Sequence, residues 1–218
     1  MKFTEIDIMS WPRGQMFYYF SKMAPTGYSL TVDIDVTDLF RKTKERNLKF
    51  FPTYLWLVTK CMNMQVEFKV AYENEKLGYY DVLTPLYATF HDDDKTFSLM
   101  WTEYDDDYEV FYQRYVENQK KYGNGHGVLA QAPLTPPLNA YTVSAIPWIS
   151  FKHFAVHTYE NKPYFFPSVE AGKLYENGVG KKMLPLSITC HHATTDGYHV
   201  EQFLENLKTE IESFCECR

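Results

Sequence analysis

Residues 184–200 read LPLSITCHHATTDGYHV, and the fold of the chain is best understood outward from this stretch. An apolar run ends at two histidines, and Asp196 and Gly197 follow. Glycine permits a tight turn because it has no Cβ atom. The stretch therefore predicts a strand over 183–190 that runs through a turn into a helix. Beyond the turn, apolar residues recur at spacings of three and four, the pattern of an amphipathic helix: Val200, Phe203, Leu204, Leu207, Ile211 and Phe214.

The preceding chain interleaves strand-like and helix-like segments. Residues 28–36 (YSLTVDIDV) alternate apolar with polar side chains, the period of a strand with one face in water. Thr37 is expected to cap a helix over 38–46, and Pro52 to begin a second helix that continues to Met62. The other expected segments are a hairpin of 86–91 with 96–101, a helix over 108–121, an irregular connection over 123–139, strands over 141–149, 154–159 and 164–169, and a turn at 176–178. Because the order is not a strict βαβ alternation, these segments predict the α+β class: a two-layer sandwich with a mixed, largely antiparallel sheet covered by helices.

Length and composition are those of an ordinary soluble globular protein, which argues against a disordered tail or a fibre. The 218 residues contain no repeat or linker and are treated as one domain over 1–218. Aromatic residues make up 17% of the chain, enough for an aromatic pocket or a large subunit interface in addition to a core. The net charge of −6 argues against a nucleic-acid partner, although local positive sites are compatible with it.

The sequence also predicts a cytoplasmic location. Glu5 and Asp7 interrupt the N-terminal stretch, which has no apolar core and does not resemble a secretory signal. No apolar stretch approaches the ~18–20 residues needed to span a bilayer, so no membrane partner is expected. The four cysteines follow no pattern and are best interpreted as reduced thiols, although Cys215 and Cys217 leave open a metal-binding tail.

His192 is the candidate general base, because an imidazole with a pKa of ~6.5 suits proton transfer near neutral pH. A purely structural pairing of His192 with Asp196 is the alternative interpretation. A zinc site made from 190–199 is disfavoured because adjacent strand residues point to opposite faces. The chain has no G-x-S-x-G nucleophile elbow, P-loop or dinucleotide glycine fingerprint, which argues against a serine hydrolase, a nucleotidase and a dehydrogenase.

Residues 192–197 contain the His-x-x-x-Asp-Gly motif, and on this motif the chain resembles the chloramphenicol acetyltransferases. Other coenzyme A-dependent acyltransferases, including dihydrolipoamide acyltransferases, share the motif. The resemblance to the chloramphenicol acetyltransferases continues in order through nearly the whole chain. Its further matches are 10–13 (SWPR), 27–31 (GYSLT), 49–52 (KFFP), 90–91 (FH), 96–98 (TFS) and 144–148 (SAIPW).

The resemblance implies a coenzyme A-dependent acyltransferase fold and O-acetylation of chloramphenicol, with antibiotic resistance as its consequence. His192 would take the proton of the acceptor hydroxyl, with its ring oriented by a bond to its own backbone carbonyl. Ser144 would stabilise the oxyanion of the tetrahedral intermediate. Asp196 and Arg13 would form an ion pair that shapes the site.

The resemblance further implies acetyl-coenzyme A as co-substrate, no metal, and a homotrimer with active sites at the subunit interfaces. Lys49, Trp148 and Lys173 match positions that line the coenzyme channel, although each lysine is equally well explained as a surface charge. The small-molecule acceptor pocket matches Tyr19, Phe20, Ala24, Thr26, Thr89, Phe97, Val156 and Glu170.

Two of these positions depart from the family. Phe20 stands where a tyrosine is usual, and Glu170 stands where a threonine is usual. A carboxylate in an apolar pocket must find a donor, take up a proton or face solvent. Either Pro167 ends its strand early and leaves Glu170 outside the pocket, or the acceptor is another alcohol or an amine. A scaffold of the same fold that binds without catalysis is the remaining hypothesis.

Overall fold

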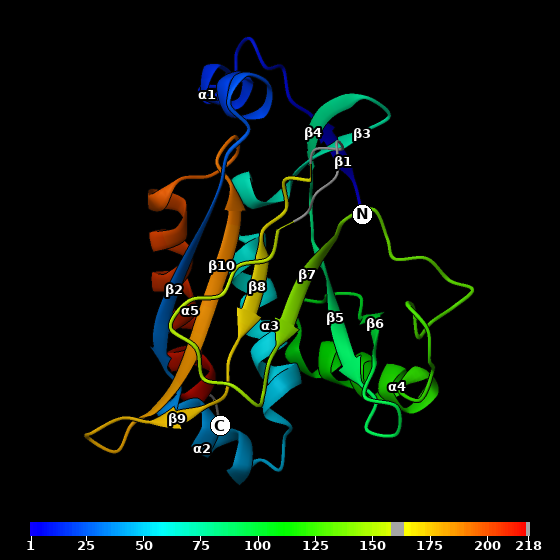
Figure 1. Ribbon diagram of the computed structural model, residues 1–218, viewed down its shortest axis with the longest axis vertical. Helices are drawn as coiled ribbons and strands as arrows, with labels where there is room; N and C mark the ends of the chain where they lie inside the picture. Colours follow the sequence, from blue (N-terminus) through cyan, green and yellow to red (C-terminus); the bar gives the residue numbers. More distant parts are fainter. Residues whose placement is uncertain (158–163, 217–218) are drawn as a thin grey trace.

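The computed structural model describes residues 1–157 and 164–216, which form two sheets and the helices that cover them (Figure 1). The smaller sheet is antiparallel, in the order β1 (Phe3–Glu5), β4 (Lys76–Tyr80), β3 (Val70–Glu73). The larger sheet has the order β2 (Gly27–Asp35), β10 (Lys182–His191), β8 (Ser168–Ala171), β7 (Ala140–Ala145), β5 (Thr84–Phe90), β6 (Phe97–Trp101), and β9 (Tyr175–Glu176) also pairs with β10.

Both strand directions occur in the larger sheet. β7 runs parallel to β5 and to β8, and the remaining pairs are antiparallel. The helices gather on one face, with α3 (Phe50–Asn63) and α5 (Gly197–Glu216) lying behind the strands in Figure 1. The predicted α+β class with a mixed, largely antiparallel sheet is therefore confirmed.

Helix α3 lies at the centre of the core because its sequence is apolar nearly all round. Leu55, Leu57 and Val58 are fully buried and belong to the same cluster as the apolar stripe of α5. Helices α2 (Thr37–Glu45) and α4 (Tyr108–Tyr122) complete this layer, and α4 is capped by the carboxylate of Asp107. Three further segments are helical: α1 (Gly14–Tyr18), the π-helical turn η1 (Tyr19–Met23) and the short 3-10 helix η2 (Glu67–Lys69).

Alternation along the strands decides which residues face away from this core. Val169 of β8 pairs with Ile188 of β10, and both side chains belong to the core cluster. Side chains of successive strand residues point to opposite faces. Glu170 and its β10 partner Ser187 therefore lie on the other face, which the irregular segment after β7 covers: the Ser187 hydroxyl donates to the carbonyl oxygen of Phe154.

Some predicted boundaries are wrong, and prolines explain two of them. β7 ends at Ala145, before Pro147, instead of reaching residue 149. β8 begins only after Pro167, because proline has no N–H for a strand ladder. Residues 154–157 form no strand, and the rest of the strand predicted over 154–159 lies outside the described residues. Thr37 is the first residue of α2 and not its cap; its N–H donates to the carboxylate of Asp35.

The small sheet and the α1–η1 segment were not expected from the sequence, because their strands and helical turns are short. Cys61, Cys190 and Cys215 are free thiols, as predicted, and Cys217 lies outside the described residues. Among the described helices, none is both long and apolar enough to cross a membrane.

Candidate active site

His192 directly follows β10, in the turn that leads to α5. Its backbone N–H donates to the carbonyl oxygen of Thr26, 2.8 Å away, which joins the turn to the segment before β2. Its Nδ1 atom lies 2.9 Å from the carbonyl oxygen of Thr195. A carbonyl oxygen can only accept, so Nδ1 carries the hydrogen. In the neutral ring Nε2 then has the free lone pair that a general base requires.

The expectation that this ring bonds its own backbone carbonyl is wrong. The partner is the carbonyl of Thr195, and the carbonyl of His192 itself faces Arg13 Nη2 at 3.4 Å. The turn over 192–196 brings the Thr195 carbonyl back toward the ring. The tautomer inferred from the resemblance is unchanged, because either carbonyl accepts a hydrogen from Nδ1.

Two aromatic rings hold the imidazole in place. Phe20 of η1 stacks on His192 with ring centroids 4.1 Å apart and an interplanar angle of 29°. Tyr28 of β2 packs against the His192 ring in a T-shaped arrangement, with ring centroids 5.4 Å apart. Burial raises the pKa of Tyr28 well above its ordinary value, so its hydroxyl stays protonated and donates to Thr195 Oγ1 at 3.3 Å. The ring of His192 is therefore fixed by a hydrogen bond and by packing on two sides.

Arg13 and Asp196 form an ion pair beside this turn. Arg13 Nη1 lies 2.7 Å from Asp196 Oδ2, with the two side chains 16% and 38% exposed. The other carboxylate oxygen of Asp196 accepts from the N–H of Tyr198 at 3.1 Å, in the first turn of α5. The pair thus connects the segment before α1, the turn at His192 and the start of α5. Among the described residues, neither Arg13 nor Asp196 makes a hydrogen bond to Nε2 of His192.

Ser144 lies near the end of β7, directly beside Glu170 of β8 in the parallel register. Glu170 is fully buried, and neither carboxylate oxygen has a hydrogen-bond partner among the described residues. Burial raises the pKa of Glu170 from 4.5 to about 7, and the nearby Ser168 hydroxyl opposes this shift. The expectation that the strand with Pro167 ends before Glu170 is therefore wrong, because β8 begins after Pro167 and buries this residue.

Ser144 and His192 lie far apart within one chain. Glu170 joins Ser144 on β7 to Ser187 on β10, two strand spacings that together measure roughly 10 Å. From Ser187 to His192 the chain advances five residues, or roughly 16 Å of extended strand. In Figure 1, β10 runs toward α1 while β7 points the opposite way. Both side chains must lie within ~3 Å of one reacting group to act together, so a single chain does not bring them to one substrate.

Known proteins are similar to this chain in sequence and in fold. The family model described as chloramphenicol acetyltransferase matches residues 1–208. The chain belongs to the chloramphenicol acetyltransferase family. A relative from Campylobacter coli, called chloramphenicol acetyltransferase, is 39% identical over 209 residues, which cover 95% of this chain and 98% of the relative. A relative of the same name from Clostridium perfringens is 38% identical over 205 residues, covering 93% and 92%.

A solved structure called chloramphenicol acetyltransferase has the same fold, with a TM-score of 0.78 at 22% identity over 95% of this chain and 97% of that one. The family and the acyltransferase class inferred from the motifs are therefore confirmed, as is the fold that they implied.

The family positions expected to contact the acceptor fall into two groups. The first group, on the His192 side, comprises Tyr19, Phe20, Ala24 and Thr26. Phe20 and Thr26 contact His192 directly, Tyr19 packs its ring against Phe20, and the Ala24 carbonyl oxygen accepts from the Thr26 hydroxyl at 2.6 Å. A second group, on the Ser144 side, comprises Thr89 of β5, Phe97 of β6 and Glu170 of β8. Val156 lies in the segment between β7 and β8, in which the carbonyl oxygen of Phe154 accepts from Ser187 of β10. No recorded hydrogen bond or ring contact joins the two groups within the described residues of one chain.

The residues expected to contact coenzyme A are exposed. Trp148 is 59% exposed and packs its ring against Phe90, with centroids 4.7 Å apart. The N–H of Lys173 donates to the carbonyl oxygen of Ile149, so Lys173 lies beside this tryptophan in space. Lys49 precedes α3, and no recorded contact links it to the other two.

Two contributors to the His192 site were not expected from the sequence: Tyr28, which walls the ring, and Thr195, which sets its tautomer. Both lie in stretches that resemble the family, 27–31 and 192–197. Their roles depend on backbone geometry and on the pairing of β2 with β10, which no local pattern in the sequence reports.

Proposed function

We propose that this protein transfers the acetyl group of acetyl-coenzyme A to a hydroxyl of chloramphenicol, as one catalytic domain over 1–218 in a cytoplasmic homotrimer. Family membership across nearly the full chain supports the reaction class. The observation that carries the proposal for this chain is the imidazole of His192, whose Nδ1–H is engaged by Thr195 so that Nε2 is left as the base.

In the proposed reaction, Nε2 of His192 removes the proton of the acceptor hydroxyl while the oxygen attacks the thioester carbon. The carbonyl oxygen of the acetyl group becomes an oxyanion, to which the Ser144 hydroxyl donates a hydrogen bond. When the intermediate collapses, the C–S bond breaks and the coenzyme A thiolate takes the proton from the imidazolium. No covalent acyl-enzyme and no metal enter this sequence of steps.

The separation of His192 and Ser144 within one chain supports an active site shared between chains. Each site would combine the His192 group of one subunit with the Ser144 group of the next. Both groups include large side chains that are exposed in the single chain: Tyr19 is 46% exposed in the His192 group, and Phe97 is 60% exposed in the Ser144 group. Trp148, on the Ser144 side, is 59% exposed. A closed ring of three subunits gives every chain both roles, because a head-to-tail interface uses two different patches of each subunit.

Complementation between two inactive variants tests both the chemistry and the assembly. His192→Ala and Ser144→Ala proteins are expected to release little coenzyme A thiol with acetyl-coenzyme A and chloramphenicol. Co-expressed with different tags and purified through both, mixed trimers are expected to regain activity, since one site in each combines an intact His192 with an intact Ser144. Mixed oligomers as inactive as their parents would contradict a shared site, and a fully active His192→Ala variant would refute the reaction.

Glu170 favours a second candidate acceptor, an alcohol or amine that carries an additional hydrogen-bond donor. A fully buried carboxyl without a partner costs free energy unless a ligand or a second chain supplies one. It lies beside Ser144, on the face where the acetyl group would be held. An acceptor that donates to this carboxylate would recover the lost hydrogen bond, and chloramphenicol would then be a weaker substrate.

The Glu170→Thr variant separates the two acceptors. If Glu170 lines the pocket, this change is expected to raise kcat/KM for chloramphenicol and to lower it for the acceptor that donates to the carboxylate, by about tenfold each. A panel of alcohols and amines in the thiol-release assay identifies that acceptor. Equal effects on every acceptor would place Glu170 outside the pocket, and binding without transfer across the panel would favour a non-catalytic scaffold.

Trp148, Lys49 and Lys173 are proposed to contact coenzyme A. Trp148 and Lys173 lie next to each other after β7 and β8, on the Ser144 side of the molecule. The nucleotide end of the coenzyme is anionic, so exposed lysines supply local positive charge to a chain whose net charge is −6.

A further inference from the structure

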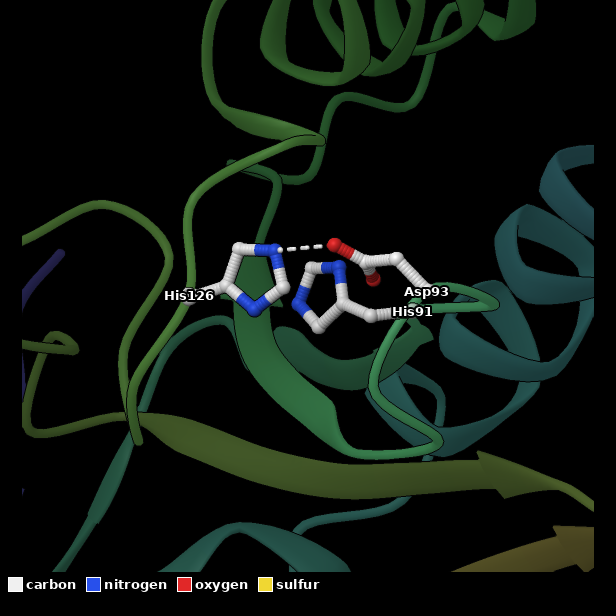
Figure 2. A group of neighbouring side chains, drawn as sticks. All are labelled: His91, Asp93 and His126. Atoms are coloured by element: carbon white, nitrogen blue, oxygen red, sulfur yellow. Dashed lines mark ion pairs between the residues drawn. The ribbon is translucent and has the colours of Figure 1, made fainter.

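Away from the active-site groups, two histidines and an aspartate converge where the β5–β6 turn meets the segment after α4. His91 and Asp93 belong to the turn, and His126 follows α4. One nitrogen or oxygen atom from each residue lies within 4.8 Å of the other two. Figure 2 shows a nitrogen of each ring on the side of the Asp93 carboxylate. None of the three side chains has a part in the reaction proposed above.

The hydrogen bonds of His91 leave its Nδ1 atom as an acceptor. The Ser98 hydroxyl donates its only hydrogen to the carbonyl oxygen of Gly127, 2.6 Å away. The 2.9 Å contact between Ser98 Oγ and His91 Nε2 therefore requires Nε2 to be the donor. A neutral imidazole carries one N–H, so Nδ1 has a lone pair, and no hydrogen bond to it is recorded among the described residues. His91 is only 6% exposed, which limits the access of water to this lone pair.

His126 presents a second acceptor to the same point. Its Nδ1 atom lies 2.9 Å from Asp94 Oδ2, so Nδ1 carries the hydrogen. Its Nε2 atom lies 3.3 Å from Asp93 Oδ2. With a neutral ring, three acceptors then face one another: two imidazole lone pairs and a carboxylate. A proton between His126 Nε2 and the Asp93 carboxylate would satisfy these two acceptors and leave His91 Nδ1 without a donor. A metal cation can bind all three acceptors at once.

We propose that His91, Asp93 and His126 bind a divalent transition-metal ion, and zinc matches this ligand set best. Two imidazoles and one carboxylate are ligands that zinc accepts, and a water completes four-coordination. Behind the ligands, Asp94 holds the N–H of His126 and Ser98 holds the N–H of His91. Such outer partners fix the tautomer and orientation of ligating histidines in metal sites.

Binding requires a small rearrangement that the structure permits. The two rings are stacked, with centroids 4.2 Å apart and an angle of 22° between their planes. An ion lies in the plane of each ligating ring, so the rings must tilt apart. The side chains of His126 and Asp93 are 44% and 71% exposed and have room to move, while His91 remains anchored by Ser98. The ion would tie the β5–β6 turn to the segment that follows α4.

Zinc titration into chelator-treated protein, followed by calorimetry, tests the site. The full-length protein is expected to bind one zinc ion per chain. His126→Ala and Asp93→Asn, both at exposed positions, are expected to abolish this binding, and Asp94→Asn to weaken it by about 10- to 100-fold. His153→Ala removes an exposed histidine outside the cluster and is expected to bind as the wild type does.

Two further measurements do not depend on enzyme activity. Zinc is expected to raise the melting temperature of the wild type and to slow hydrogen exchange in the β5–β6 turn, because a ligand that binds only the folded state stabilises it. The His126→Ala variant should show neither effect. A wild type that binds no zinc would overturn the proposal and leave His126 only with its contacts to the carboxylates of Asp93 and Asp94. Zinc binding by His126→Ala and Asp93→Asn as tight as that of the wild type would also overturn it.

Discussion

The turn after β10 and the adjoining centres of β7 and β8 differ in how their polar side chains are satisfied. At the turn, the Nδ1–H of His192, the carboxylate of Asp196 and both Nη atoms of Arg13 find partners within the chain, and only the buried Nε of Arg13 has none among the described residues. At β8, Glu170 is buried more completely and its carboxylate has no partner among the described residues. Every charged group at the turn therefore has a hydrogen-bond partner, whereas the buried carboxylate of Glu170 has none on either oxygen.

The charged groups of the His192 turn are partnered within one chain, whereas the Glu170 carboxylate requires a partner from a ligand or a second chain. A satisfied network holds its groups in one geometry, which suits a base that must keep one tautomer. A buried group without a partner is the place where a ligand or a second subunit gains the most by supplying one. Four predictions test this division, from the largest expected effect to the smallest.

Removal of the base should have the largest effect. His192→Ala is expected to lower kcat for acetyl transfer by about 10²- to 10⁴-fold, because the variant lacks the imidazole proposed to take the hydroxyl proton. Thiol release under saturating acetyl-coenzyme A measures this loss. Circular dichroism and the oligomeric mass should match the wild type; an unchanged kcat would mean that the turn after β10 is ordered for a reason other than catalysis.

Neutralising the unpartnered carboxyl should stabilise the protein at alkaline pH. The pKa of Glu170 is raised from 4.5 to about 7 in the folded state, so the folded chain binds more protons between these values and stability falls as pH rises. Glu170→Gln removes that loss and should raise the free energy of unfolding by about 2–3 kcal/mol at pH 8, with little gain at pH 4.

Urea denaturation of both proteins at the two pH values measures this difference. Equal gains at pH 4 and pH 8 would contradict the assignment of a buried, ionisable Glu170. A gain that disappears when a saturating acceptor is added would show that the ligand supplies the missing partner.

Breaking the satisfied network should destabilise the turn. Asp196→Asn is expected to cost about 1–3 kcal/mol, below the roughly 3–5 kcal/mol of a fully buried pair, because solvent reaches Asp196. Burial opposes ionisation of Asp196, but Arg13 and His199 outweigh it and hold its pKa below the ordinary value. The contribution is therefore present above the unfolded pKa and is lost as the pH falls through the lowered pKa of the folded state, so wild type and variant should converge only below that lowered pKa.

The control is Asp38→Asn, which removes an exposed ion pair with Arg41 of the kind that contributes little. Melting temperature and turnover of both variants are measured together. An Asp196→Asn protein with the stability and rate of the wild type would show that the ion pair does not support the His192 turn.

The smallest effects are expected at the lysines proposed for coenzyme A. Lys49→Ala and Lys173→Ala should each raise KM for acetyl-coenzyme A by about two- to fivefold and leave kcat nearly unchanged, because exposed charges contribute ~1 kcal/mol or less. Lys76→Ala, which removes an exposed partner of Glu5, is the matched control. An equal change in all three variants would assign the lysines to general surface charge.

Local sequence patterns were sufficient to predict the long helices and strands. They were insufficient for segments whose structure depends on pairing with a distant strand. The stripe from Val200 to Phe214 and the alternation over 28–36 correspond to α5 and β2. The predicted strand over 154–159 did not appear in 154–157, because β-like composition alone does not supply a neighbouring strand. Glu170 was recognised as unusual from the sequence, but its burial depended on the register of β8 with β7 and β10.

The amino-acid sequence by itself determined the family, the class of fold and the identity of the proposed base, because motif residues and periodicity are properties of the chain order. Only the tertiary structure decided that Thr195, and not His192 itself, sets the tautomer of the imidazole. It also decided that Ser144 and His192 lie apart within one chain, and that His91 meets His126. Distances between residues far apart in the chain follow from strand order, register and turn geometry, which local sequence patterns do not encode.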